Sequence, residues 1–364
     1  MGRRWKKQSH ENDPIANFRA MDDAEDKHRN NNTTSSSSEA AGRTTKASTT
    51  KDDSFRDEPY SSDGEEDDEE EVYIVKQEYA YLSYGFSFVQ TVIMGLLIWQ
   101  CGIAPLRINP MLGPYPDALS EWGGKNAVLI LDEDDNEWWR LLTPILLHAG
   151  LLHLFANVSV QLEAGAFFEK EWGSARWLII YLGSAVASSV LSVIVMPQSV
   201  SVGSSGAVMG LFGAKLAELL LKWCHKADTK EARISAKVRK EQCCMVTCSV
   251  VTVMAFSFIP YVDWAAHLGG LLGGLVIGCV IFALELEFMS CKFLWFALGL
   301  ATTIAMYAAA IWYMYNGDIE VVEELRDVCG YYQQQFEDYE CRCMKEEYAN
   351  NNGEDNGDRM LFLY

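Results

Sequence analysis

Long apolar stretches dominate the middle of the chain. Between about residues 80 and 315, hydrophobic segments alternate with shorter polar connections, and each segment reaches the roughly 20 residues that an α-helix needs to cross a bilayer. The pattern predicts an all-α, polytopic membrane bundle of seven transmembrane helices. The predicted helices lie at about 82–104, 141–164, 175–197, 205–223, 243–260, 263–284 and 293–315.

The two ends of the chain are polar and acidic. Residues 1–78 are rich in Ser, Thr, Asn, Asp and Glu and include an acidic run from Asp63 to Glu71, so they offer too little apolar surface to fold. The whole chain of 364 residues is 49 % hydrophobic and yet carries a net charge of −20. We therefore expect a disordered acidic cytosolic tail at 1–78, a membrane domain at 79–315 and an extracytoplasmic acidic tail at 316–364.

Basic residues set the expected orientation. The densest basic stretch between segments runs from Lys222 to Lys240, and positively charged loops remain in the cytosol. Alternating the other loops from this anchor places the N-terminus in the cytosol, and it places the C-terminus and the loop at 105–140 on the extracytoplasmic side. Arg140 either ties that loop down or extends its charge to the membrane surface.

The second segment is unusually polar for a membrane helix. The polar residues in it or just beyond it are His148, His153, Asn157, Gln161, Glu163 and Glu169. Polar side chains inside a membrane normally face the bundle interior or a cavity, and they mark function by default. His153 and Asn157 are four residues apart and share one helical face. The alternative is that these side chains are hydrogen-bonding contacts between helices.

A hydroxyl group stands between glycines where the fourth segment begins. The stretch Val202-Gly203-Ser204-Ser205-Gly206 leads from irregular sequence into an apolar helix. A helix N-terminus has unpaired amides and a partial positive charge, which would stabilise a reacting oxygen at Ser205. A helix that begins inside lipid is tolerated only around a cavity, whereas an ordinary loop-to-helix junction would lie at the membrane surface.

Small residues predict that the fourth and sixth segments pack closely. They recur at four-residue spacing, as Gly206, Gly210 and Ala214 in one segment and as Ala266, Gly270, Gly274 and Gly278 in the other. Such faces let two helices approach each other, which would bring Ser205 next to His267. A lone intramembrane histidine can otherwise serve packing or proton transfer.

A serine next to a histidine suggests nucleophilic catalysis. Serine needs a positioned base, and neutral histidine can accept its proton and later return it to a leaving amine. Asp263 precedes His267 by four residues, but its expected place is the outer mouth of the segment, so we predict a dyad rather than a triad. The available donors to an oxyanion are the backbone amide of Ser205 and the side chains of His153 and Asn157.

Together these residues resemble the rhomboid family of intramembrane serine proteases over roughly 80–315. The matching positions are Gly203-Ser204-Ser205-Gly206 for Gly-x-Ser-Gly, Ala266-His267 with Gly270 and Gly274, Trp139-Arg140, the set His148, His153 and Asn157, and Glu169 with Arg176. The resemblance implies that Ser205 is the nucleophile and His267 the general base. It also implies that His153 and Asn157 bind the oxyanion, supported by His148 and Gly203. Some members have a tyrosine where this chain has Met209.

The resemblance also implies a substrate class and a location. Such proteases cleave single-pass transmembrane proteins in or near the membrane, preferring small residues at the cut and weak helices beyond it. Six core helices followed by a seventh resemble the eukaryotic secretory-pathway form, which would place the chain in the Golgi, plasma membrane or endosomes. The expected partners are the lipid bilayer and these substrates, and no nucleic acid.

Two other classes of function remain open. A non-proteolytic relative would bind membrane clients for trafficking or degradation, although such relatives usually lack the serine or the histidine. A transporter or channel would also place polar residues in the membrane, but the membrane segments show no internal repeat of the kind that many transporters have.

We expect no cofactor and no metal site. His148, His153 and His267 lack an intramembrane carboxylate or cysteine that would complete a zinc site. Of the ten cysteines, Cys329, Cys341 and Cys343 fall in the predicted outer tail, where one disulfide would leave an odd thiol. The cysteines at 224, 243, 244 and 248 cluster near the cytosolic face, where burial is the expectation and palmitoylation is the alternative.

Overall fold

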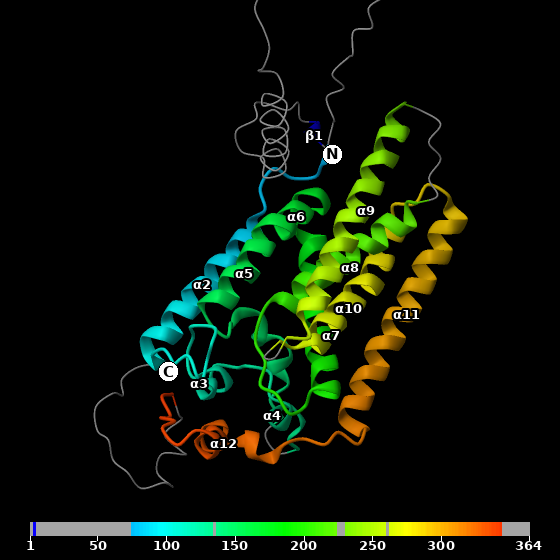
Figure 1. The fold of residues 1–364 in the computed structure, drawn as a ribbon. Helices are drawn as coiled ribbons and strands as arrows, with labels where there is room; N and C mark the ends of the chain where they lie inside the picture. The colour runs from blue at the N-terminus through cyan, green and yellow to red at the C-terminus, as the bar shows by residue number, and fades with distance from the viewer. Residues whose placement is uncertain (1–2, 5–73, 134–135, 224–229, 260–261, 344–364) are drawn as a thin grey trace, which may run out of the picture. The chain divides into compact units, whose positions relative to one another are not determined.

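The computed structural model describes residues 3–4, 74–133, 136–223, 230–259 and 262–343 (Figure 1). The described residues from Ile74 onward belong to one compact unit, which holds the helices of the described residues. Nearly all of the predicted tail at 1–78 and the end of the predicted tail at 316–364 lie outside the described residues. The short strands are β1 (Arg3–Arg4) and β2 (Ile74–Val75).

The helices follow the predicted apolar segments in chain order. The first half contains α2 (Tyr81–Cys101), α3 (Pro116–Glu121), α4 (Ala127–Leu131), η1 (Trp138–Leu141), η2 (Thr143–Leu146), α5 (Leu151–Val160), the π-helical turn η3 (Gln161–Gly165) and α6 (Ala166–Trp172). The second half contains α7 (Ser174–Val195), α8 (Ser205–Leu221), α9 (Lys230–Phe256), α10 (Trp264–Ala283), α11 (Met289–Asn316), η4 (Glu323–Arg326) and α12 (Val328–Gln335).

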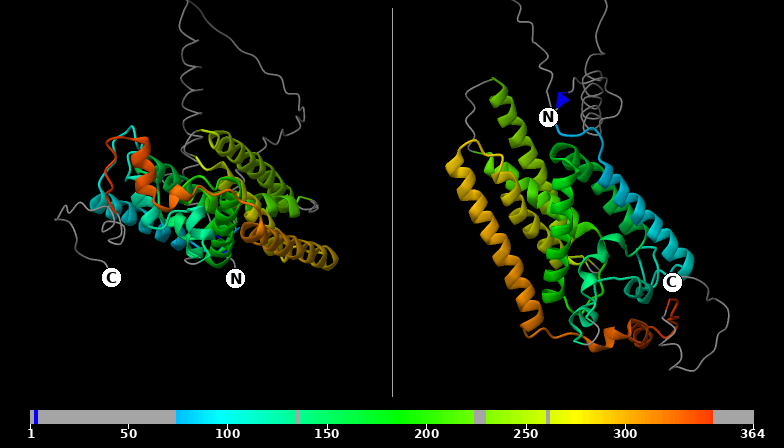
Figure 2. Two further views of the ribbon diagram at one scale, coloured as in Figure 1. Left: turned by 90° about the horizontal axis from the view of Figure 1, so that it is seen from below. Right: turned by 180° about the vertical axis from the view of Figure 1, so that it is seen from behind.

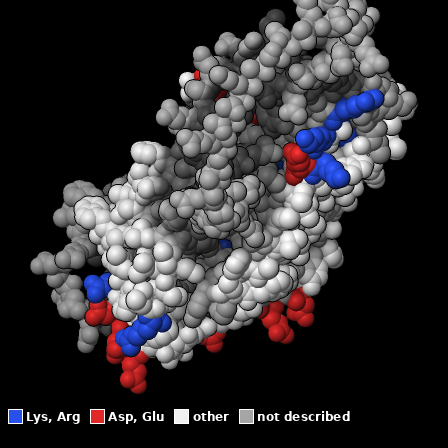
Figure 3. Space-filling model, turned by 45° about the horizontal axis from the view of Figure 1, so that its top comes forward, with Lys and Arg blue, Asp and Glu red and all other residues white. Residues whose placement is uncertain are grey.

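Five of the described helices are long and apolar enough to cross a membrane. They are Tyr81–Cys101, Leu151–Trp172, Ser174–Val195, Trp264–Ala283 and Met289–Asn316. On the face shown in Figure 3, most charged side chains gather toward two ends and an uncharged band lies between them. The chain is therefore a helical membrane protein. A count of seven crossings stays a prediction, because α8 has only 17 residues and α9 begins with a polar stretch.

Two predicted spans differ in their bounds from the corresponding helices. The second segment was expected at 141, but its helix begins at Leu151, because Trp138–Leu146 form the separate turns η1 and η2, the latter with Pro144 near its start. The fifth was expected at 243, but α9 begins at Lys230. Hydropathy locates apolar residues, whereas the α9 helix continues through polar ones.

Helix α10 packs against α7, α8 and α11 (Figure 1). A Cβ atom on Gly269 would lie 2.6 Å from the carbonyl oxygen of Ala187 in α7, and one on Gly273 would lie 2.6 Å from the Cβ of Ala187. Because contacts under 3.0 Å are not tolerated, only glycine permits this approach. Close packing of small residues replaces the hydrophobic effect as the force between helices in lipid.

Glu169 and Arg176 have structural contacts away from the predicted catalytic residues. The buried carboxylate of Glu169 accepts hydrogen bonds from the backbone amides of Leu82 and Ser83, at 2.9 and 2.8 Å, in the first turn of α2. Arg176 pairs with Glu285, which also accepts from Lys222 at 2.8 Å. Burial alone would raise the pKa of Glu285, but hydrogen bonds from Lys222 and Arg176 lower it well below its ordinary value. These contacts tie the ends of the helices together.

Arg140 ties down the segment that connects α2 to α5. Its side chain is 2 % exposed and donates to the carbonyl oxygens of Ser120 and Gly124, the latter at 3.0 Å, while it pairs with Glu137. Of the two alternatives weighed for this arginine, the structure confirms the tie. Residues 102–133 and 136–146, which include α3 and α4 and which we call the outer segment, are thereby held together.

The chain after α11 folds back over the outer segment. Helix α12 contacts α3, and the two are seen together in Figure 2. The hydroxyl of Tyr339 donates to Asp117, and the amide nitrogen of Asn126 donates to the carbonyl oxygen of Leu325 at 2.8 Å. Burial, followed by the charge of Asp117, raises the pKa of Tyr339 far above its ordinary value. We call residues 317–343 the C-terminal strap.

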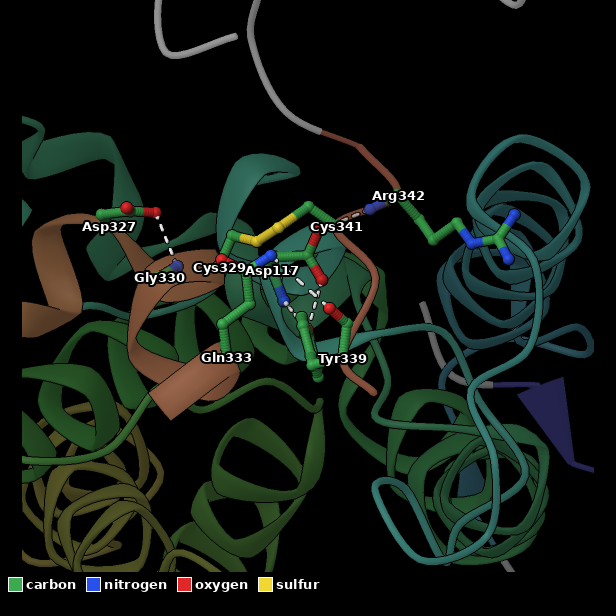
Figure 4. Close-up of a disulfide and its surroundings, with 8 residues drawn as sticks. All are labelled: Asp117, Asp327, Cys329, Gly330, Gln333, Tyr339, Cys341 and Arg342. Atoms are coloured by element: carbon green, nitrogen blue, oxygen red, sulfur yellow. Dashed lines mark hydrogen bonds between the residues drawn. A yellow bond between two sulfur atoms is a disulfide. The ribbon is translucent and has the colours of Figure 1, made fainter. Parts of the chain in front are cut away.

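Disulfides fasten the C-terminal strap. Cys329 pairs with Cys341 inside the strap (Figure 4), and Cys343 pairs with Cys101, the last residue of α2. The expectation of an odd thiol among the outer cysteines was wrong, because Cys101 had been assigned to the interior of a membrane segment. The expectation of burial was also wrong for Cys244 and Cys248, which are exposed, while Cys224 lies outside the described residues.

Candidate active site

Ser205 is the first residue of α8, and the chain reaches it through a glycine with a positive φ angle. Gly203 has φ +134°, a value that residues with a side chain rarely adopt. Its amide donates to the carbonyl oxygen of Pro144 at 2.9 Å, which holds this turn against η2. Ser205 therefore lies at the end of α8 where backbone amides lack partners within the helix.

His267 in α10 lies directly opposite Ser205. Its Nε2 is 2.6 Å from the Oγ of Ser205, and the histidine is 7 % exposed. The backbones of the two helices approach closely beside this contact. A Cβ on Gly270 would lie 1.9 Å from the carbonyl oxygen of Gly206, and one on Gly274 would lie 1.8 Å from that of Gly210. The close approach that small-residue spacing predicted is confirmed.

The other ring nitrogen of His267 has a partner that the sequence did not reveal. Nδ1 lies 2.5 Å from the Oγ of Ser257, which is 1 % exposed and follows the last residue of α9. The same hydroxyl donates to the carbonyl oxygen of Val253 at 2.6 Å. His267 is thus held between two serine hydroxyls, one on each nitrogen.

His153 lies beside the same turn. Its Nδ1 accepts from the backbone amide of Ala149 at 3.3 Å. A Cβ on Gly203 would lie 2.9 Å from Cε1 of His153, 3.2 Å from its Nε2 and 3.6 Å from the Oγ of Ser205. The space that a side chain at Gly203 would fill is therefore bordered by both the His153 ring and the Ser205 hydroxyl.

Asn157 and His148 contact Ser204. The hydroxyl of Ser204 donates to the Oδ1 of Asn157 at 3.4 Å and lies 3.4 Å from the Nε2 of His148. The side-chain amide nitrogen of Asn157 donates to the carbonyl oxygen of His153, four residues earlier, at 2.9 Å. The rings of His148 and His153 meet edge to face with centroids 5.4 Å apart. Ser204 thus joins this group, although sequence reasoning did not single it out.

Asp263 begins α10. One carboxylate oxygen accepts from the amide of Ala266 at 2.8 Å, and the other accepts from the hydroxyl of Ser192 in α7. These bonds cap the helix that carries His267.

Comparison with known proteins places the residues of this site within one family domain. Residues 135–284, which include each of the side chains above from Arg140 to His267, match the family model of the rhomboid domain. This part of the chain is a rhomboid domain.

This rhomboid protein is similar to several plant and parasite relatives. It is 35 % identical over 188 residues to "RHOMBOID-like protein 6, mitochondrial" of Arabidopsis thaliana, covering 51 % of this chain and 56 % of the relative. It is 32 % identical over 141 residues to "Rhomboid-like protease 3" of Toxoplasma gondii, covering 39 % and 51 %. It is 31 % identical over 175 residues to "Inactive RHOMBOID-like protein 8" of Arabidopsis thaliana, covering 48 % and 46 %. The chain spans about half the length of these curated relatives.

Proposed function

We propose that this rhomboid protein is an intramembrane serine endopeptidase that cleaves single-pass transmembrane proteins through Ser205 and His267. The observation that carries the proposal is the 2.6 Å contact between His267 Nε2 and Ser205 Oγ at the start of a buried helix. This distance is within the range required of a nucleophile and its general base. Names of relatives do not decide the matter, because they include both a protease and a protein called inactive.

In the proposed reaction, His267 Nε2 accepts the proton of Ser205 as Oγ attacks the scissile carbonyl. The same proton then passes to the leaving amine, and water repeats the sequence on the acyl-enzyme. The attacked peptide bond must first leave its helix, because helical hydrogen bonds shield its carbonyl. Substrate segments that unwind easily are therefore preferred.

The proposed oxyanion site is the space beside Gly203. In neutral His153, an Nδ1 that accepts from Ala149 leaves the proton on Nε2, so this nitrogen is a donor bordering that space. The amide of Ser205 at the start of α8 is the second donor. The side-chain nitrogen of Asn157 has two N–H groups and donates one to the carbonyl oxygen of His153, so the second is the further donor that Asn157 would offer. In the present geometry it supports the site by fixing Ser204 and the first turns of α5.

We infer that the C-terminal strap lies on the extracytoplasmic side, in the secretory pathway. The cysteines of both disulfides gather where α2 ends and where the strap covers the outer segment, and disulfides persist in oxidising compartments. Cys291, in contrast, is free and exposed in the first turn of α11, whose far end leads into the strap. The basic residues of α9 support a cytosolic location for the opposite ends of the helices.

The test is cleavage of a panel of tagged single-pass proteins by the purified full-length chain in liposomes. We expect Ser205→Ala to lower the cleavage rate by at least about a thousand-fold, because the nucleophile is lost. Ser159→Ala, at an exposed position of α5, serves as the control and should cleave normally. Cleavage by Ser205→Ala would overturn the proposal. Binding of the panel without cleavage by the wild type would favour a role in handling membrane clients.

A further inference from the structure

Ser257 occupies a position that the proposed reaction does not by itself explain. It follows the last residue of α9, whereas Ser205 is on α8 and His267 on α10. Its backbone amide donates to the carbonyl oxygen of Val253 at 2.9 Å, which continues the helical pattern by one residue. The hydroxyl is buried and lies within 2.6 Å of two partners, the carbonyl oxygen of Val253 and Nδ1 of His267.

The protons in this cluster can be assigned by counting donors. A carbonyl oxygen only accepts, so the contact with Val253 requires the hydroxyl proton of Ser257. The oxygen of Ser257 is then left as an acceptor toward His267, and the proton between them belongs to Nδ1. A neutral imidazole carries one proton. Nε2 of His267 is therefore unprotonated, and this is the nitrogen that faces Ser205 at 2.6 Å.

The opposite assignment would disable the base. If Ser257 donated to Nδ1, the proton of His267 would be on Nε2. That nitrogen could then not accept the proton of Ser205. The carbonyl oxygen of Val253 would then keep the backbone amide of Ser257 as a donor but lose the hydroxyl, and one hydrogen bond of the cluster would be lost. The back-bonding of Ser257 to its own helix thus selects the tautomer that can act as a base.

We propose that Ser257 is a positioning residue that fixes the tautomer and ring orientation of His267, taking the place of the carboxylate in a catalytic triad. The inference rests on the proposed function, because it concerns the base of that reaction. When His267 takes up a proton, the chain from Nδ1–H through Ser257 to the carbonyl dipole of Val253 stabilises the imidazolium. Asp263, the carboxylate nearest in sequence, is committed to Ala266 and Ser192.

The experiment compares Ser257→Ala and Ser257→Thr with the wild type in liposomes, using the best substrate of the panel. Loss of the hydrogen-bond partner that orients a metal-bound histidine typically costs about 10–100-fold in activity, and we take the same magnitude for the partner of His267. We expect Ser257→Ala to lower kcat by that factor with KM nearly unchanged, and Ser257→Thr, which keeps the hydroxyl, to restore most of it. Ser249→Ala, two turns earlier on α9, is the control and should match the wild type.

The pH–rate profile separates this role from a merely structural one. In Ser257→Ala the protonated imidazole loses its acceptor, so the acid limb of kcat should move to lower pH. The charge of His267 interacts with those of Asp263 and His153, and both of these residues are unchanged in each variant. Ser257→Cys, with a similar volume and a weaker acceptor, should shift the limb in the same direction and provides a second variant if alanine unfolds the protein.

The outcomes distinguish the two proposals. A wild type that neither cleaves nor reacts at Ser205 with a fluorophosphonate probe overturns the proposed function itself. A wild type that reacts, together with a Ser257→Ala variant that keeps its kcat and its pH profile, overturns the role of Ser257 alone. Equal losses in the alanine and threonine variants also overturn it, because the hydroxyl would then not be the cause.

Discussion

Lys125 is a buried cation that joins the outer segment to the loop before Ser205. It is 1 % exposed, and its backbone pairs with that of Ser201 through hydrogen bonds of 2.8 and 3.0 Å. Its Nζ donates to the carbonyl oxygen of Met196 at 2.9 Å. Burial lowers the pKa of Lys125 to about 8, although the negative charge of Asp263 acts in the opposite direction. The charged form therefore costs stability in the folded protein.

This cost gives a pH dependence of known sign. Between about pH 8 and the ordinary lysine pKa of 10.5, the folded protein binds fewer protons at this site than the unfolded chain, so this contribution to stability rises with pH. Below pH 8 the penalty is complete and constant. We expect the melting temperature of the wild type, relative to that of Lys125→Met, to increase between pH 8 and 10 in detergent. A parallel pH dependence of the two proteins would contradict this.

The sequence predicted the residues of the candidate site unevenly. Ser205, His153 and His267 could be singled out because a hydroxyl at a helix start and imidazoles in apolar segments are rare signals. Ser204 and Ser257 could not, because serine is common in membrane helices and only the fold shows what it contacts. The contacts of Ser205 and His267 are now described, but their catalytic roles stay predictions until cleavage is measured.

At the scale of the helices, the contact between α8 and α10 determines the geometry of the site. Carbonyl oxygens of α8 occupy the places where side chains of α10 would begin, so each glycine in the contact sets the separation of the two backbones. The serine and the imidazole are carried by these two helices, and their distance follows from that separation.

We expect Gly270→Ala to separate the helices and to reduce cleavage by about a hundred-fold, because a misplacement of about 1 Å at reacting groups has that effect. The added Cβ would otherwise lie 1.9 Å from a backbone oxygen. Gly95→Ala on α2 is the matched control, since a Cβ there meets nothing within 4 Å. Cleavage rates and melting temperatures of both variants check this. Normal cleavage by Gly270→Ala would show that the helices adapt.

Most of the helices could be placed from hydropathy, and the connections could not. The apolar segments that form α2, α7, α10 and α11 are long enough to give a clear hydropathy signal. The outer segment mixes prolines, tryptophans and charges, so the pattern gave no indication of α3 or α4. Their positions depend on contacts with residues far along the chain, such as those of Asn126 with Leu325.

At the scale of the whole molecule, cysteine chemistry provides a test of orientation. In sealed vesicles without reductant, we expect a membrane-impermeant maleimide to modify Cys291 from the cytosolic side, and Cys291→Ser to reduce that modification. The four cysteines of the disulfides should react only after reduction, and only from the opposite side. Labelling from the reverse sides, detected as a gel shift, would contradict the proposed orientation. The two disulfide pairings could not have been predicted from the acidic composition of the ends of the chain.

The bond between Cys101 and Cys343 has a consequence for the integrity of the protein. Because these cysteines are 242 positions apart, every helix from α3 to α12 lies within one covalent ring. A single backbone cut in any loop of that ring leaves the pieces joined, so a nicked copy would keep its full mass and its assembled helices. Only a reducing environment would let the fragments separate. Proteolytic damage and loss of the bundle are therefore separate events in this molecule.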